Sequence, residues 1–128
     1  MIKLVYCITK KPGLSDEEFF RYWQSVHGPI GVRIPGLRKL VQSRRLVIPG
    51  DKYASDYDGM AELWFDNVEA LLAARTSPEW KASSEDEGNF IDRDKVENHF
   101  KRALDEARKL AKSKEADYLP GWCGKTDV

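Results

Sequence analysis

Residues 10–30, "KKPGLSDEEFFRYWQSVHGPI", place a turn, the start of a helix and one of the chain's two histidines in a single short stretch. The proline and glycine that follow the two lysines predict a turn. Ser15 is a good N-cap residue, and Glu18, three residues later, completes a capping box. Gly28 and Pro29 indicate where this helix ends. We therefore expect one helix that begins after Ser15 and ends at the glycine and proline.

The segments on either side of this helix predict strands. Residues 2–9, "IKLVYCIT", precede it, and residues 37–48 and 59–65 follow it. Turn residues bound these segments, and the last two are expected to pair as a hairpin. A further helix is predicted to start near Asn67, and another helical turn at Ser77, which is followed by proline. The order β-α-β-β-α predicts an α+β protein with a ferredoxin-like βαββα(β) fold.

The C-terminal part of the chain does not clearly supply the last strand of that fold. A short strand fits only around residues 90–96 or at residues 118–119. Residues 95–112 instead carry apolar side chains at helical spacing. We therefore divide the chain into a ferredoxin-like domain at residues 1–94 and a C-terminal helical extension and tail at residues 95–128. The extension is expected to pack on the same domain or on a dimer partner.

The composition indicates a soluble globular protein. The chain has 128 residues, 41% of them hydrophobic, and its 21 basic residues are balanced by 21 acidic ones. That balance lacks the basic footprint of a nucleic-acid-binding protein. The two cysteines lie far apart, and two histidines without clustered carboxylates at ligand spacing argue against a metal site. With no recognisable leader or membrane span, we expect a cytoplasmic protein that binds neither nucleic acid nor membrane.

His27 is the first candidate for chemistry. At about 100° per residue around a helix, it falls in the same apolar arc as Phe20 and Trp23. Burial disfavours a charged imidazolium, whereas the end of a helix favours it, and this balance suits a general acid–base group. The alternative is a core histidine that hydrogen-bonds a carbonyl group, and the pattern alone does not choose between the two.

Glu62 is the second candidate, because strand alternation in "GMAELWF" puts it on one face between Met60 and Trp64. A carboxylate between two large apolar side chains needs a partner if that face is buried. It either contacts a substrate or forms a structural ion pair with Arg44 or Arg45 of the neighbouring strand.

Three other features are interpreted more simply. Tyr6, on the first strand, lies on the same sheet as Glu62, where it either orients a ligand or is a core tyrosine. The acidic run at residues 85–87 is interpreted as a solvated face. His99 falls away from the apolar stripe of the C-terminal helix and is expected to be exposed.

Three stretches of the chain resemble the EthD-type family, named after ethyl tert-butyl ether degradation. They are "KKPGLSDEEFFRYWQSVHGPI", "IPGLRKLVQS" and "YDGMAELWFDNVEALLAARTSPEW", and the resemblance runs from residue 1 to about residue 92. Its most specific motif is Phe-x-x-Tyr-Trp-x-x-x-His-Gly-Pro, whose histidine is His27. The resemblance implies a dimeric α+β barrel, in which two ferredoxin-like protomers join their sheets face to face. It also implies activity of the cofactor-free proton-transfer kind, on small aromatic or lactone-like substrates.

Carried over to this chain, the resemblance implies that His27 and Glu62 are the helix histidine and the strand glutamate of the family. We expect these two residues to be catalytic, and Tyr6, Trp23 and Trp64 to bind the substrate by lining the apolar wall of the pocket. We expect a homodimeric, cofactor-independent lyase or isomerase, of the dehydratase or cyclase kind, with no metal. It would move a proton on a small aromatic, polyketide-like or lactone substrate. The alternatives are oxygenase-like chemistry or haem handling through His27, and a non-catalytic accessory protein that binds a hydrophobic metabolite.

The chain departs from the family pattern near its C-terminus. Members commonly end with a strand that carries Glu-His, and "ENH" at residues 97–99 matches this loosely. A helical segment stands where that strand should run, so the roles of His99 and of a closing strand stay open.

Overall fold

The computed structural model describes residues 1–52 and 55–96 of the chain. The predictions for most of the C-terminal helix, for His99 and for the tail fall on residues 97–128 and lie outside the described part.

In the described residues, three antiparallel strands form one sheet, and the third of them along the sequence lies in the middle. The order is β1-β3-β2. The strands are β1 (Ile2–Ile8), β2 (Lys39–Arg44) and β3 (Gly59–Phe65). The hairpin predicted between β2 and β3 is confirmed.

The register sorts the side chains onto two faces of the sheet. Tyr6 of β1 and Gln42 of β2 both lie opposite Ala61 of β3, so these three form one row. The next row is centred on Glu62 and points to the other face, because successive residues of a strand alternate. Ala61 is buried in the core with the helices, which identifies the face that the helices cover.

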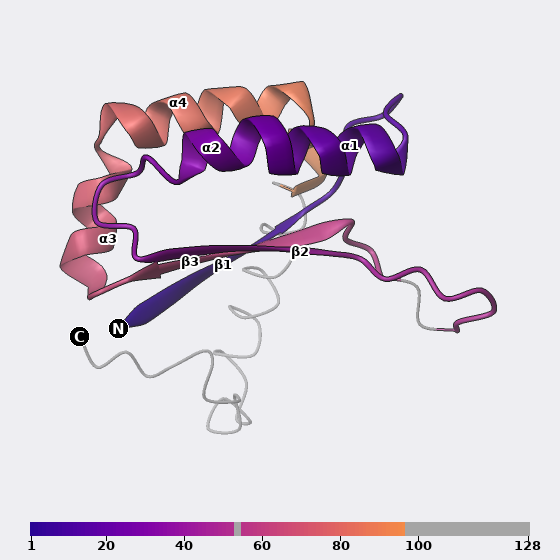
Figure 1. Ribbon diagram of the computed structural model, residues 1–128, viewed down its shortest axis with the longest axis horizontal. Helices are drawn as coiled ribbons and strands as arrows, with labels where there is room; N and C mark the ends of the chain where they lie inside the picture. The colour runs from indigo at the N-terminus through magenta and orange to yellow at the C-terminus, as the bar shows by residue number, and fades with distance from the viewer. Residues whose placement is uncertain (53–54, 97–128) are drawn as a thin grey trace, which may run out of the picture. The chain divides into compact units, whose positions relative to one another are not determined.

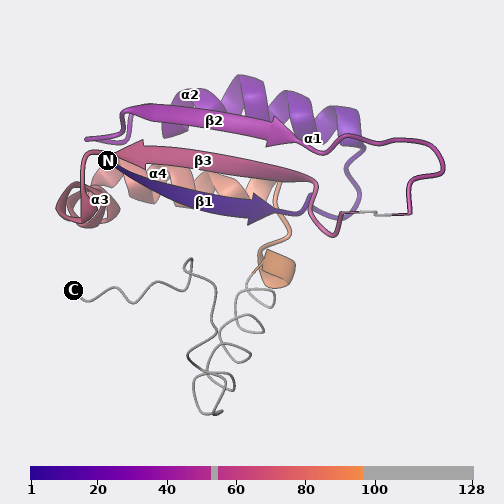
Figure 2. The same ribbon diagram turned by 90° about the horizontal axis from the view of Figure 1, so that it is seen from below.

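Helices cover that one face of the sheet, giving an α+β fold of two layers (Figures 1 and 2). Between β1 and β2, three helical segments follow one another without a break: α1 (Asp16–Tyr22), η1 (Trp23–His27) and α2 (Gly28–Gly31). After β3 come α3 (Val68–Arg75), α4 (Pro78–Asp86) and η2 (Glu87–Asn89), and α4 packs beside α2. None of the helices in the described residues has the length and apolarity that crossing a membrane requires.

The predicted helix starts are confirmed. The Ser15 hydroxyl accepts the backbone N–H of Glu18 at 3.1 Å, and the Glu18 carboxylate accepts the N–H of Ser15 at 2.9 Å. Asn67 caps α3 and Ser77 caps α4, with Pro78 in the first turn of α4. Each cap satisfies a backbone donor that the helix itself leaves free.

The core between the layers consists of two clusters. One joins α1 and η1 to the sheet and to the chain after η2, and contains Ile8, Phe19, Trp23, Ala61, Phe90 and Ile91. The other holds α3 on the sheet and contains Ile34, Phe65 and Ala74. In the first cluster the indole of Trp23 lies directly over Gly59, where a Cβ atom would come within 2.6 Å of the ring. The glycine therefore allows the helix to approach β3 this closely.

One expectation for a strand is wrong, and one of the two places left open for a final strand does not form it. The strand expected over residues 37–48 ends at Arg44, because its partner β3 begins only at Gly59, directly opposite. The apolar residues 46–48 beyond it are exposed. Around residues 90–96, where a fourth strand fits, Ile91 makes a single bridge to Lys10, and residues 93–96 are helical.

Candidate functional site

The first helical run does not end at Gly28 and Pro29, so that prediction is wrong. η1 is a π-helix, in which the N–H of Gly28 donates to the carbonyl of Trp23, five residues earlier. α2 then begins at Gly28 with Pro29 in its first turn, a position where the missing N–H of proline is tolerated. The change from π to α geometry therefore lets the helix continue through a proline.

The π-helix also changes the neighbours of His27. In an α-helix, residues five apart point about 140° away from each other, whereas the wider turn of a π-helix, with hydrogen bonds between residues five apart, brings them closer to the same face. Tyr22 and His27 are five residues apart, and both side chains reach Asp86 at the end of α4. The imidazole points inward, with 13% of the side chain exposed. His27 therefore contacts α4. The α-helical spacing used in the sequence analysis placed His27 beside Phe20 and did not reveal this contact.

Asp86 gathers three side chains around its carboxylate. Its Oδ2 lies 2.8 Å from Nδ1 of His27. Its Oδ1 accepts the hydroxyl of Tyr22 at 2.6 Å and the side-chain amide of Asn89 at 3.1 Å. The ring of Phe90 packs against the imidazole, with 4.7 Å between the centroids. We call Tyr22, His27, Asp86 and Asn89 the His27–Asp86 cluster.

The protonation of the cluster follows from these contacts. Burial alone would raise the pKa of Asp86, but the hydrogen bonds from Tyr22, His27 and Asn89 outweigh it and lower that pKa below its ordinary value. The pKa of the Tyr22 hydroxyl is raised because it donates to Asp86. An ionised carboxylate only accepts hydrogen bonds, so Nδ1 of His27 carries a hydrogen. In the neutral ring, Nε2 is then the nitrogen that can accept a proton, with Asp86 stabilising the resulting charge.

A second pair of titratable groups lies next to this cluster in the sequence. Tyr6 of β1 and Glu87 of η2 share a hydrogen bond. Burial raises the pKa of Glu87 to about 7; Arg93 and the bond to Tyr6 oppose this rise, and the charge of Asp86 adds to it. The pKa of Tyr6 is raised to about 12, first by burial and then by the negative charge of Glu87. Tyr6 therefore contacts an acidic group on the helical face of the sheet.

Glu62 and Trp64 lie on the other face of the sheet, away from His27. Glu62 forms an ion pair with Lys3 of β1, with 2.7 Å between Oε1 and Nζ, and not with either of the two arginines considered from the sequence. The same Nζ lies 4.9 Å from the ring centroid of Trp64. The sheet thus separates Glu62 from the other residue that was predicted to be catalytic.

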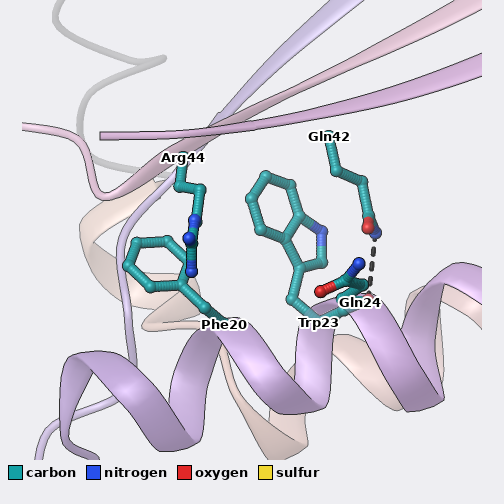
Figure 3. Close-up of a pocket in the computed structure, with 5 residues that line it drawn as sticks. All are labelled: Phe20, Trp23, Gln24, Gln42 and Arg44. Atoms are coloured by element: carbon teal, nitrogen blue, oxygen red, sulfur yellow. Dashed lines mark hydrogen bonds between the residues drawn. The ribbon is translucent and has the colours of Figure 1, made fainter. Parts of the chain in front are cut away.

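Trp23 lines a pocket between the helical layer and the sheet, shown in Figure 3. The pocket has a volume of about 210 Å³ and is lined by Phe20, Trp23, Gln24, Gln42 and Arg44. The side-chain amide of Gln42 donates to the carbonyl of Trp23 at 3.0 Å. His27 is not among the residues that line this pocket.

Asp86 and Glu87 were missed because the acidic run at residues 85–87 was interpreted as a solvated face. That interpretation holds for Glu85, whose side chain is 67% exposed and lies 3.7 Å from the ammonium group of Lys81. A signal against it was present in the sequence, because carboxylates in the last turn of a helix oppose the helix dipole. Acidic residues at such a position need partners elsewhere in the fold. Asp86 finds them in Tyr22 and His27.

Nowhere in the described residues do three or more His, Cys, Asp and Glu side chains lie together in a way that could hold a metal ion. The candidate site consists of one histidine, its carboxylate partner and the hydroxyl and amide groups that donate to that carboxylate.

Comparison with known proteins places the chain in a family. The EthD domain profile matches residues 11–94, a range that contains the whole His27–Asp86 cluster. A solved structure of an EthD (ethyl tert-butyl ether) family protein from Bacillus halodurans C-125 is similar, with a TM-score of 0.58 and 26% sequence identity. The match covers 71% of this chain and 92% of that one. No curated protein sequence matches the chain. The chain belongs to the EthD family.

Proposed function

We propose that the protein is an acid–base enzyme, a lyase or isomerase, that moves a proton on a small aromatic, polyketide-like or lactone substrate. The observation that supports this is the 2.8 Å contact between Nδ1 of His27 and the carboxylate of Asp86. The carboxylate fixes the ring and its tautomer, which leaves Nε2 to take a proton from one atom of the substrate and return it to another. Such a reaction needs no cofactor, because a single imidazole does both steps.

Tyr22 and Asn89 act as positioning residues in this proposal. Both donate to Oδ1 of Asp86, so the carboxylate cannot turn its other oxygen away from His27 without losing them. Because the bonds to Tyr22 and His27 also keep the carboxylate ionised, Asp86 can stabilise the imidazolium that forms during the reaction.

The experiment measures proton transfer itself and so does not require the natural substrate. Benzofuran-2(3H)-one, an aromatic lactone with an acidic α-hydrogen, is incubated with the protein in D2O, and NMR follows the exchange of that hydrogen. We expect His27→Ala to slow the enzyme-dependent exchange by about 10²–10⁴-fold and Asp86→Asn by about 10–100-fold. Ser25→Ala, an exposed position on the same π-helix, is the matched control and should leave the rate unchanged.

Three outcomes would contradict the proposal. Equal exchange rates for the wild type and His27→Ala, in proteins that both fold, would remove the catalytic role of the histidine. A Soret band on titration with haem that is lost in His27→Ala would instead identify haem handling. Saturable binding of the lactone without accelerated exchange would favour a non-catalytic binding protein.

We propose further that the protein works as a homodimer through the face of the sheet that the helices leave free in the described residues. Val5 and Met60 on this face are 45% and 36% exposed, an arrangement that suits burial against a second copy. Sedimentation equilibrium tests this: we expect twice the 14.7 kDa mass of the chain. A monomer at micromolar concentration would refute it, and Met60→Glu should shift the wild-type dimer towards monomer.

A further inference from the structure

The pocket of Figure 3 combines two aromatic rings with a guanidinium group that has no acidic partner in the described residues. Phe20, Trp23 and Gln24 come from the helical run, and Gln42 and Arg44 come from β2. The side chain of Arg44 crosses the face of Phe20, with 5.2 Å from its Cζ to the ring centroid. Stacking of this kind holds the plane of the guanidinium and leaves its N–H donors at the edge free to bind.

The neighbouring arginines differ from Arg44 in this respect. Arg45 pairs with Asp16 and with Asp58, each at 3.3 Å, and Arg38 makes a two-pronged pair with Asp66. Within residues 1–52 and 55–96, no ion pair joins Arg44 to a carboxylate. The positive charge at the pocket is therefore not neutralised by the described part of the fold.

The opposite wall of the pocket provides a fixed hydrogen-bond acceptor. The side-chain amide nitrogen of Gln42 donates to the carbonyl of Trp23 at 3.0 Å, which holds the amide group in one orientation. The carbonyl oxygen of Gln42 is then the end of that amide that can accept a hydrogen bond from a ligand. Between this oxygen and Arg44 lies the indole of Trp23, as Figure 3 shows.

The volume restricts the ligand. Pockets for drug-sized ligands measure about 300–1,000 Å³, so the 210 Å³ pocket suits a single ring with small substituents. We propose that this pocket binds a single-ring aromatic carboxylate, with the carboxylate on Arg44, the ring against Trp23 and a ring hydroxyl, where present, donating to Gln42. The site goes beyond the proposed proton transfer, because His27 does not line it.

Benzoate is the probe, and benzamide, which has the same shape without the charge, is the matched ligand control. Binding is followed by NMR titration of the full chain at constant ionic strength. We expect saturable binding of benzoate and at least tenfold weaker binding of benzamide. Arg44→Gln should weaken benzoate binding about 10- to 100-fold, the range for losing hydrogen bonds to a charged group, and should leave benzamide unaffected.

Arg75→Gln is the matched protein control. Arg75 also stacks on an aromatic ring, with 5.7 Å from its Cζ to the centroid of Trp80, but it does not line the pocket. Its replacement should not change benzoate binding. Equal affinities for benzoate and benzamide, equal losses in Arg44→Gln and Arg75→Gln, or no saturable binding would each overturn the proposal. Binding is also measured with His27→Ala, where we expect wild-type affinity, so failure of the proton-transfer proposal leaves this result interpretable.

Discussion

Replacing Glu87 by glutamine tests whether this carboxyl group is held protonated in the folded protein. Glu87→Gln keeps the shape of the side chain and an oxygen that can accept from Tyr6, but the new side chain cannot ionise. The charged and titratable groups that face it are Tyr6 of β1, Arg93 and the preceding Asp86. All three remain in the variant, so a difference in stability between the two proteins reports mainly on the ionisation of Glu87.

The magnitude follows from the pKa of Glu87, which burial raises from 4.5 to about 7 in the folded protein. Because the folded state binds this proton more tightly than the unfolded chain, the stabilisation is fully present below pH 4.5 and is lost as the pH rises to about 7. Each pKa unit corresponds to about 1.4 kcal/mol. We therefore expect the wild type to lose up to about 3 kcal/mol relative to Glu87→Gln across this interval, and less if solvent screens the partly exposed carboxyl.

The assay is urea denaturation at a series of pH values, followed by tryptophan fluorescence, for which Trp23, 3% exposed, is a buried reporter. The free energy of unfolding of the wild type minus that of Glu87→Gln is plotted against pH. Glu85→Gln is the control, because the Glu85 side chain is 67% exposed. For this variant the difference in the free energy of unfolding should change by no more than about 0.5 kcal/mol over the pH range. A curve for Glu87→Gln as flat as the control, or one that rises with pH, would refute the reasoning.

Three further predictions concern stability at neutral pH. Asp86→Asn should destabilise the protein by about 1.5–3 kcal/mol, since the charge-assisted hydrogen bonds from Tyr22 and His27 are weakened. Because the pKa of Asp86 is lowered in the folded protein, this loss of stability should persist above pH 3.8 and shrink as the pH falls below that value. Acid titration of both proteins measures it. Gly59→Ala should cost about 1–3 kcal/mol and shift the tryptophan fluorescence, because the added Cβ would lie 2.6 Å from the ring of Trp23; unchanged urea midpoints would contradict this. Ser15→Ala should cost about 1 kcal/mol by removing the cap of α1, measured as a lower melting temperature without loss of the folded baseline.

The parts of the fold that depend on neighbours in the sequence were predictable. The cap at Ser15 with its partner Glu18 is made by residues three apart, and the extent of β3 is set by alternation and by its bounding glycine. The caps at Asn67 and Ser77 likewise need only the next few residues. Such signals survive folding because no distant contact has to form before they are satisfied.

The π-helix was not predictable, because a distant strand supports it. The carbonyl of Trp23 accepts the N–H of Gly28 and also the side-chain amide of Gln42, which lies 19 residues away in the sequence. A Cβ at Gly28 would stand 3.4 Å from that amide, so the glycine of the His-Gly-Pro motif gives Gln42 its room. Helical-wheel reasoning assumes one period throughout and therefore did not reveal the contact between His27 and Asp86.

The placement of two carboxyl groups at the end of α4 is informative about function. Asp86 and Glu87 are adjacent in sequence, yet their pKa values move in opposite directions: hydrogen-bond donors lower that of Asp86, and burial raises that of Glu87 to about 7. A stable fold does not need this, since a solvent-exposed acid in the same turn, such as Glu85 beside Lys81, costs little. Neighbouring titratable groups with opposed pKa shifts are what acid–base chemistry requires, because one group must carry charge while another carries a proton. The inward turn of these two side chains therefore supports a site built around His27 more strongly than the burial of the histidine does alone.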